Sequence, residues 1–305
     1  MTISTPTQTL TIGSRGSQLA LWQARFVASQ LGRAGVATRI EIIKTTGDHL
    51  QTASLAQSGG KGLFTKEIED ALLGRSIDLA VHSLKDLPTE SPDGLTIAAI
   101  PERENPFDAV VGKNLMHLRE GAKVGTSSGR RAAQLRILRP DLVTEPIRGN
   151  VDTRLRKQKA GEFDAILLAA AGLIRLGLEE EIAQIFTANE FCPAAGQGAL
   201  AIQTRLSDDA EAVCARLNHS ATSQAVRCER ALLSQLGGGC QLPVGAFAQS
   251  SGAALDLLAV VVAPDGSKQL RVHLYGESAK PEELGQRAAD ELLSRGAAQL
   301  LTGCD

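Results

Sequence analysis

The amino-acid sequence predicts an α/β protein with two larger domains and a small α+β domain at the carboxyl end. The chain has 305 residues, a length typical of two or three domains. Strand-like runs alternate with helical patterns over the first two-thirds of the sequence, which is the pattern of parallel α/β folds. After Asn218 this alternation stops, and a helix is followed by three strands and a second helix.

The first elements follow a short polar tail. Residues 1–9 have neither a cationic start nor an apolar stretch, so they predict a frayed terminus and not a signal peptide. A strand is expected over Thr9–Gly13, and Leu19, Trp22 and Phe26 recur at helical spacing from about Ser17. Further strands are expected at 39–43, 77–82, 95–100, 109–112, 122–125, 143–147, 165–169 and 199–203, with helices between most of them.

Two irregular segments predict crossings between domains. Pro101–Pro106 is polar and bracketed by prolines, and Cys192–Gly198 is rich in Pro, Ala and Gly. Two crossings form a hinge, so the expected domains are 1–100 with 199–217, an inserted domain over 105–195, and a third domain over 218–305. The third domain is expected to have helices at 223–235 and 281–296 and strands at 244–249, 254–263 and 269–275.

The composition excludes several classes of protein. Hydrophobic residues make up 43% and charged residues 22% of the chain, so neither disorder nor a membrane protein is indicated. No apolar stretch approaches the ~18 residues that a transmembrane helix needs. The formal net charge of −2 argues against binding of nucleic acid by the whole surface. Between Thr126 and Ala160, however, nine cations face three acids, which predicts a local anion site.

The five cysteines form no CxxC pair, so neither a disulfide framework, nor a structural zinc site, nor any other metal site is expected. This pattern fits a reducing cytoplasm. Cys240 ends a run of three glycines, Gly237–Gly239, and Pro243 follows it. Two interpretations are open. A lone cysteine is commonly a small buried hydrophobe, whereas a thiol on a permissive loop is an attachment point for a large group.

Arginines stand where strands run into helices. Arg15 precedes the first helix, Arg130 and Arg131 follow Val124–Ser128, and Arg148 and Arg154 flank another expected helix start. The amino end of a helix already carries positive partial charge, so cations there are unfavourable unless an anion lies among them. The alternative is that each arginine is a solvated surface residue. Because open α/β sheets bind ligands at the carboxyl ends of their strands, the set predicts a ligand with several anionic groups.

Carboxylates suit this set of arginines better than phosphates do. Guanidinium groups bind carboxylates in pairs of hydrogen bonds. The chain has neither a GxxxxGK[ST] loop nor a strand-linked GxGxxG, which nucleotide sites use. Residues 51–62, rich in Gly, Ser, Ala and Gln, predict a mobile lid. Lys61 is either a further cation from this lid or a solvated loop lysine.

The segment Asp78–Pro88 runs from a buried strand into a polar turn. It brings His82, Ser83, Lys85 and Asp86 to the same carboxyl edge. An Asp in a cleft of arginines stays ionised and can stabilise a developing cation or transfer a proton. The alternative is that Asp86 caps the turn before Pro88.

Taken together, these motifs resemble the porphobilinogen deaminase family, also called the hydroxymethylbilane synthases, along essentially the full chain. The matching stretches, in order along the chain, are Arg15 and Ser17 with 19–23, 59–64, 80–86, 124–128 with Arg130 and Arg131, 148–150 with Arg154, 171–173 with Arg175, 193–198 and 237–240. Two positions depart from the family pattern. Gln57 stands where a lid lysine is common, and Gly129 replaces a bulkier apolar residue at a helix start.

The resemblance implies the chemistry and the fold. Cys240 would hold a covalent dipyrromethane cofactor, onto which four porphobilinogen molecules condense with loss of ammonia before hydrolysis to linear hydroxymethylbilane. It also implies two domains like those of periplasmic binding proteins, a cofactor-bearing third domain, and a monomer with porphobilinogen as its small-molecule partner and no nucleic-acid or membrane partner. Asp86 would be catalytic. The residues implied to bind cofactor and substrate are Arg15, Ser17, Lys61, Ser83, Lys85, Thr126, Ser127, Ser128, Arg130, Arg131, Arg148, Gly149, Arg154, Arg175 and Gln197.

Two other functions use part of the same pattern. A non-catalytic two-lobed binding protein shares the hinge and the anion-binding helix ends, but it has no need of Cys240. A phosphate-transferring enzyme is less well supported, because the chain lacks both phosphate-loop motifs and an acidic metal site.

Overall fold

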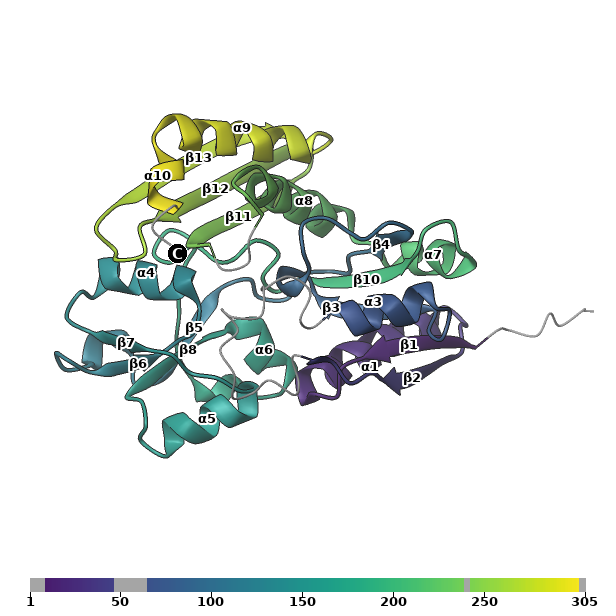
Figure 1. Ribbon diagram of the computed structural model, residues 1–305, viewed down its shortest axis with the longest axis horizontal. Coiled ribbons are helices and arrows are strands. Elements are labelled where there is room, and N and C mark those ends of the chain that lie inside the picture. Colours follow the sequence, from purple (N-terminus) through teal and green to yellow (C-terminus); the bar gives the residue numbers. More distant parts are fainter. Residues whose placement is uncertain (1–8, 47–64, 239–241, 302–305) are drawn as a thin grey trace, which may run out of the picture. The chain divides into compact units, whose positions relative to one another are not determined.

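The computed structural model describes residues 9–46, 65–238 and 242–301. The chain divides into two compact units (Figure 1). The first unit comprises the chain up to Glu102 together with Leu200–His219, and the second comprises Arg103–Ala199 together with the chain from Ser220 onward. The second unit therefore contains both the expected inserted domain and the expected carboxyl-terminal domain.

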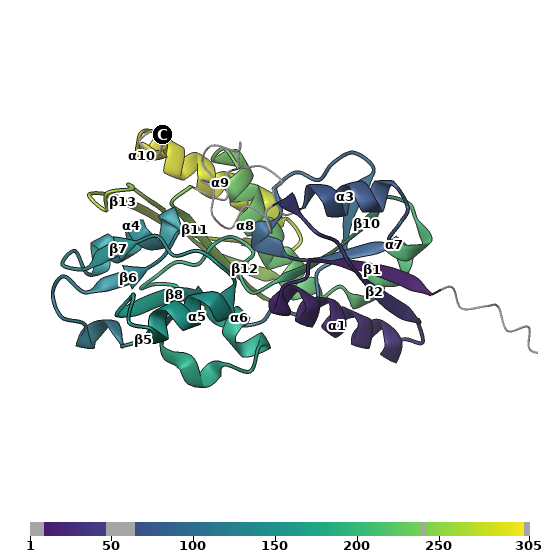
Figure 2. The same cartoon turned by 60° about the horizontal axis from the view of Figure 1, so that its bottom comes forward.

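The first unit is built on a five-stranded sheet of order β2-β1-β3-β10-β4. The strands are β1 (Leu10–Ser14), β2 (Thr38–Ile42), β3 (Leu79–Ser83), β4 (Leu95–Ala99) and β10 (Leu200–Arg205). Helices α1 (Gln18–Arg33) and α3 (Lys66–Leu73) cover opposite faces, as Figure 2 shows. Each helix buries an apolar stripe, which includes Ala24, Val27 and Leu31 on α1 and Ile68 and Leu72 on α3. Helix α7 (Asp209–Cys214) and the short helix η5 (Ala215–Leu217) complete the unit.

The second unit repeats this arrangement in a sheet of order β7-β6-β8-β5-β9. Its strands are β5 (Asp108–Gly112), β6 (Lys123–Gly125), β7 (Val143–Glu145), β8 (Ala165–Ala169) and β9 (Ile182–Ile185). Its helices are α4 (Gly129–Leu138), α5 (Val151–Lys159) and α6 (Ala170–Arg175), with η3 (Leu115–His117) and η4 (Glu179–Glu181) as short turns. The sequence does not predict strand β9. Its four residues, which follow an acidic turn, are too few to show the alternation of apolar and polar side chains that indicates a strand.

Neither sheet is wholly parallel, which corrects the sequence-based expectation. In the first sheet, β10 runs antiparallel to both β3 and β4. In the second, β5 runs antiparallel to both β8 and β9. These two strands directly follow the two crossings, so each enters its sheet from the carboxyl edge of the parallel strands. The first residues of a strand that starts at that edge therefore lie at the same edge as the arginine motifs.

The carboxyl-terminal part of the second unit is a small α+β layer. Strands β11 (Val244–Ser251), β12 (Ala254–Val262) and β13 (Gln269–Glu277) form an antiparallel sheet. Helices α8 (Ser220–Gln235) and α9 (Pro281–Ser294) pack on one of its faces, and α4 lies toward the other (Figure 1). Helix α10 (Ala297–Leu301) ends the described chain. The predicted α/β class with a small α+β carboxyl-terminal part is confirmed.

Glu229 on α8 connects this layer to both crossings. Its carboxylate, which is fully buried, accepts two hydrogen bonds from Arg103, at 2.7 and 3.1 Å. It also accepts from the backbone N–H groups of Gly196 (2.7 Å) and Ala248 (2.8 Å). One carboxylate thus holds the outgoing chain, the returning chain and strand β11 together within the second unit. Among the described helices, none is long and apolar enough to span a membrane.

Candidate functional site

The carboxyl edge of the first sheet carries one group of predicted site residues. Strands β1 and β3 are parallel neighbours, so the residues after Ser14 and Ser83 lie at the same edge. Arg15 follows β1 and is half-buried. Ser17 caps α1, because its hydroxyl accepts from the backbone N–H of Ala20 at 3.3 Å. The hydroxyl of Ser83 accepts from Nε2 of Gln23 at 2.8 Å.

Asp86 lies at this edge on a short, fixed turn. It is the last residue of the 3-10 turn η2 (Leu84–Asp86), which continues directly from β3. Leu84 is fully buried and anchors the turn, whereas Lys85 is half-buried and Asp86 is exposed. The carboxylate of Asp86 is therefore presented to solvent from an anchored segment, which is the geometry needed by a group that meets a ligand.

His82 is held beneath this edge by two linked hydrogen bonds. Its Nε2 lies 3.1 Å from Oε1 of Gln203, whose Nε2 donates to Glu69 at 3.3 Å. The Glu69 carboxylate accepts only, so it orients the Gln203 amide and leaves an oxygen facing His82. The Nε2 of His82 must then carry the proton. Burial, opposed by the Gln203 hydrogen bond and reinforced by the charge of Arg15, lowers the pKa of His82 to about 4.

This depressed pKa predicts a loss of stability in mild acid. In the unfolded chain His82 has the ordinary pKa of 6.5, so between about pH 6.5 and 4 the unfolded state binds more protons. Stability falls across this window by about 3 kcal/mol as the pH drops. Denaturant unfolding at several pH values should show this loss in the wild type but not in His82→Gln, and the difference in stability between the two proteins should stop changing with pH above about pH 7. Equal slopes for both proteins from pH 6.5 to 4 would contradict it.

The carboxyl edge of the second sheet carries a larger group. After β6, the hydroxyl of Ser127 donates to the carbonyl of Ile147 at 2.7 Å, which joins the loops behind β6 and β7. The hydroxyl of Thr126 accepts from the N–H of Ser128 at 3.2 Å. Ser128 in turn caps α4 through the N–H of Arg131 at 3.4 Å. These hydroxyl groups fix the loop that leads into α4. The first residue of α4 itself is Gly129.

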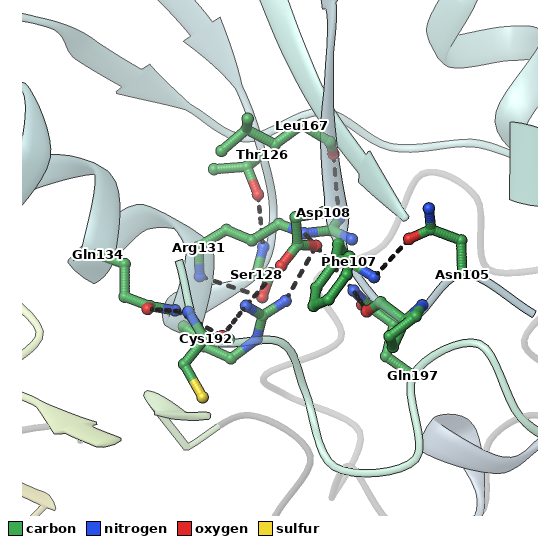
Figure 3. A network of polar contacts seen from close by, with 12 residues as sticks. Asn105, Phe107, Asp108, Thr126, Ser128, Arg131, Gln134, Leu167, Cys192 and Gln197 are labelled. Carbon is green, nitrogen blue, oxygen red and sulfur yellow. Dashed lines mark hydrogen bonds and ion pairs between the residues drawn. The ribbon is translucent and has the colours of Figure 1, made fainter. Parts of the chain in front are cut away.

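Arg130 and Arg131 are buried at this helix start and share one carboxylate. The fully buried Asp108 side chain accepts hydrogen bonds from both, and Figure 3 shows it beside Arg131. Arg130 donates to it twice, at 2.7 and 3.1 Å, and Nε of Arg131 donates at 2.7 Å. Nε2 of Gln197 donates to the same carboxylate at 3.1 Å. The anion expected among these arginines is therefore supplied, in this structure, by a residue of the chain itself.

The other predicted arginines of this unit lie behind β7 and β8. Arg148 is half-buried, and Nε of Arg154 donates to the carbonyl of Gly149 at 2.8 Å. Gly149 has φ of +112°, and a Cβ there would lie 2.6 Å from Thr153, so a side chain is excluded. Arg175 is buried and donates to the carbonyl of Gly198 at 2.6 Å. Burial lowers the pKa of Arg175 to about 10, against the opposing effect of Glu104, so it stays charged at neutral pH.

Two further arginines of the cationic segment have structural partners instead. Arg136 donates to the carbonyl of Pro264 at 2.5 Å and to Thr144 at 2.9 Å. Arg139 forms an ion pair with Asp141 at 2.6 Å. The local excess of positive charge therefore overstates the size of the anion site, because part of it stabilises the fold.

Two predicted residues, Lys61 and Cys240, lie outside the described residues, as do the lid at 51–62 and Gln57. The three described cysteines are all buried. Burial raises the pKa of Cys192 and of Cys214 to about 12, and it raises the pKa of Cys228 as well. Since the thiolate is the nucleophile, these three thiols are unreactive at neutral pH.

Sequence comparison decides the family. The profile described as "Porphobilinogen deaminase, dipyromethane cofactor binding domain" matches residues 10–213, and the one described as "Porphobilinogen deaminase, C-terminal domain" matches 223–294. The chain belongs to the porphobilinogen deaminase family. The porphobilinogen deaminase of Pelobacter propionicus is 50% identical over 302 residues, with 97% of each chain covered. That of Geotalea daltonii is 47% identical, with 96% of this chain and 93% of the relative covered.

Solved structures also resemble parts of the chain. The methionine binding protein MetQ has a TM-score of 0.45 and 10% identity over 68% of this chain and 89% of its own. An ABC-transporter periplasmic substrate-binding protein from Coxiella burnetii has a TM-score of 0.41 and 14% identity, over 72% of this chain and 96% of its own.

The residues at the second edge fit the dipyrromethane cofactor that the matching porphobilinogen deaminase profile names. The side chains gathered around the Asp108 carboxylate carry guanidinium, amide and hydroxyl groups. This donor set suits a ligand with several carboxylates and is unsuited to a metal cation. The arginines are predicted from the sequence, and the hydroxyl residues and Gln197 from the family resemblance, but Asp108 is not predicted; its one signal is a charged residue at the start of a buried strand.

Proposed function

We propose that this chain is a hydroxymethylbilane synthase. It converts four molecules of porphobilinogen and one water into linear hydroxymethylbilane and four molecules of ammonia, on a dipyrromethane primer attached to Cys240. The main support for this proposal is the sequence identity of 46–50%, over nearly the full chain, to relatives named porphobilinogen deaminase. The primer, when bound, supplies a nucleophilic carbon to which the growing product is joined.

Asp86 is the proposed catalytic residue. Its exposed carboxylate lies on an anchored turn at the carboxyl edge of the first sheet. A carboxylate in that position can accept hydrogen bonds from pyrrole N–H groups. It also stabilises the positive charge that develops on porphobilinogen as ammonia departs. The low pKa of His82 leaves that neighbour neutral at working pH, so the charge at this edge does not change with its protonation.

The arginines are proposed to bind the acetate and propionate side chains of the pyrrole rings. Bidentate guanidinium contacts fix a carboxylate in both distance and plane. The hydroxyl, lysine and amide groups would line the same sites, and Gly149 would allow close approach of the backbone. The proposed set is Arg15, Ser17, Lys61, Ser83, Lys85, Thr126, Ser127, Ser128, Arg130, Arg131, Arg148, Gly149, Arg154, Arg175 and Gln197.

The remaining parts of the proposal concern the setting of the reaction. We propose three domains with boundaries near 1–100 with 199–217, 105–195 and 218–305. The chain would act as a monomer in the cytoplasm, with no nucleic-acid partner. The three described cysteines, which are buried and unpaired, support the cytoplasm, and the formal net charge of −2 supports the proposal that nucleic acid is not a partner. Analytical ultracentrifugation of the purified protein tests the monomer.

Intact-mass spectrometry tests the whole proposal. The purified wild-type chain should weigh more than its translated polypeptide by one dipyrromethane unit. Addition of porphobilinogen should then produce further species in steps of one pyrrole unit, because the product grows on the attached primer. A wild-type chain that weighs no more than its polypeptide, even after incubation with porphobilinogen, would contradict the proposal and favour a non-catalytic binding protein.

A further inference from the structure

Asp108 is the common partner of three residues proposed to bind substrate and cofactor. Its carboxylate accepts hydrogen bonds from Arg130, Arg131 and Gln197. We propose that Asp108 is a positioning residue that sets the orientation and the net charge of this arginine pair, and so the affinity for the carboxylates of porphobilinogen. The inference rests on the proposed function of the chain.

The fold places Asp108 at this edge for a topological reason. Strand β5 runs antiparallel to β8, and Asp108, its first residue, pairs with Ala169, the last residue of β8. An acidic residue at the start of β5 therefore lies beside the carboxyl ends of β6 and β8, where α4 begins. The same residue at the start of a parallel strand would lie at the opposite edge.

Hydrogen bonds on both sides hold the two guanidinium groups in fixed planes. Arg130 meets Asp108 through both terminal nitrogens, and one of them also donates to the carbonyl of Cys192 at 2.7 Å. Arg131 meets Asp108 through Nε and donates from a terminal nitrogen to the carbonyl of Leu167 at 3.0 Å (Figure 3). Their exposures of 4% and 6% show that solvent does not compete for these donors.

The carboxylate also connects the arginine pair to the returning crossing. Gln197 donates from Nε2 to Asp108 and, at 2.8 Å, to the carbonyl of Pro106. The carbonyl of Gln197 in turn accepts from Nε of Arg103 at 2.7 Å. Asp108 is thus the point at which the start of α4 and both crossing segments meet within the second unit.

The net charge of this group of residues favours a bound anion. The Asp108 carboxylate still neutralises part of the charge of the two arginines. Two guanidinium groups and one carboxylate carry a net charge of +1, at a helix start that adds positive partial charge. Without Asp108, two buried cations would repel each other and lose their common acceptor. An Asn at this position keeps the shape, but its NH₂ group faces a guanidinium N–H, so at least one arginine must turn away.

The test compares two buried carboxylates of the second unit. Steady-state kinetics of the holoenzyme should show that Asp108→Asn raises the KM for porphobilinogen about tenfold or more, since a hydrogen bond to a charged group is lost. Glu229→Gln is the matched control, because Glu229 is equally buried and also binds an arginine through two bonds. Both variants should lower the melting temperature, and only Asp108→Asn should raise KM. Equal changes of KM in both would overturn the inference.

A double-mutant cycle and a salt series distinguish positioning from charge. The effects of Asp108→Asn and Arg131→Lys on kcat/KM should not combine independently in the double variant. The effects of Asp108→Asn and Arg154→Lys should combine independently, so that their fold-changes multiply to within about twofold. The rise of KM should persist at about 500 mM salt, because the lost hydrogen bonds involve buried groups, which added ions screen little. If KM in Asp108→Asn falls, as the added positive charge alone would predict for an anionic substrate, the positioning role is excluded.

A second variant applies if Asp108→Asn does not fold. Asp108→Glu keeps the charge but moves the carboxylate by one methylene, and a normal KM in the folded variant would also overturn the inference. The wild-type control separates this test from that of the proposed function. A wild type that does not consume porphobilinogen refutes the function, whereas an active wild type matched by Asp108→Asn refutes only the role of Asp108.

Discussion

Replacement of Cys240 by Ser is expected to give a folded protein that retains no dipyrromethane and makes no hydroxymethylbilane. A thioether to the primer requires a thiol of accessible pKa, and a serine hydroxyl is too weak a nucleophile to replace it. Serine differs from cysteine by a single atom, and the three residues before Cys240 are glycines without side chains, so the substitution should leave the fold intact. Intact mass and the rate of product formation measure both effects, and turnover should fall to the background of the assay.

Two control variants isolate the effect of this thiol. Cys214→Ala removes a buried thiol whose pKa is raised to about 12, so this variant should keep the full mass increment. Cys304→Ser removes the other cysteine that lies outside the described residues, and it should keep the increment as well. If either control loses the added mass while Cys240→Ser retains it, the attachment site has been assigned to the wrong residue.

Much of the fold is predictable from local sequence pattern. Runs of buried aliphatic residues locate β1, β3 and β8 to within one or two residues of their observed bounds. The direction of β5 and β10 is not predictable in this way, because it depends on which edge the chain enters after a crossing. Strand β9 is missed for a different reason: residues 182–185 alternate in burial over too short a length to form a recognisable period.

The candidate site is predictable in part. Arginines at the starts of helices are visible in the sequence, because they oppose the helix dipole and therefore require an anion. The identity of that anion is not visible. Asp108 lies more than twenty residues from Arg130, and it meets Arg130 and Arg131 only because β5 is antiparallel. Its role depends on tertiary contact, and its one signal in the sequence, an acidic residue at the start of a buried strand, does not indicate what that residue contacts.

Asp86→Ala is expected to lower kcat by about 100-fold or more, with a smaller change in KM. Removal of a group that stabilises charge in the transition state costs about this much, equivalent to roughly 2.7 kcal/mol of activation free energy. Because Asp86 is exposed, the free energy of unfolding should change by no more than about 0.5 kcal/mol. Single-turnover measurements on the holoenzyme should show normal binding of porphobilinogen followed by slow release of ammonia.

Asp93→Ala is the matched control for this prediction. Asp93 is also exposed and lies in the same connection between β3 and β4, but it precedes Leu95, the first residue of β4. Strand β4 is antiparallel to β10 and therefore parallel to β3, so Asp93 lies at the opposite edge of the sheet from Asp86. The two substitutions remove the same charge, and only the one at the carboxyl edge should slow the reaction. Near-normal kcat in Asp86→Ala, or an equal loss in Asp93→Ala, would exclude a catalytic role for Asp86.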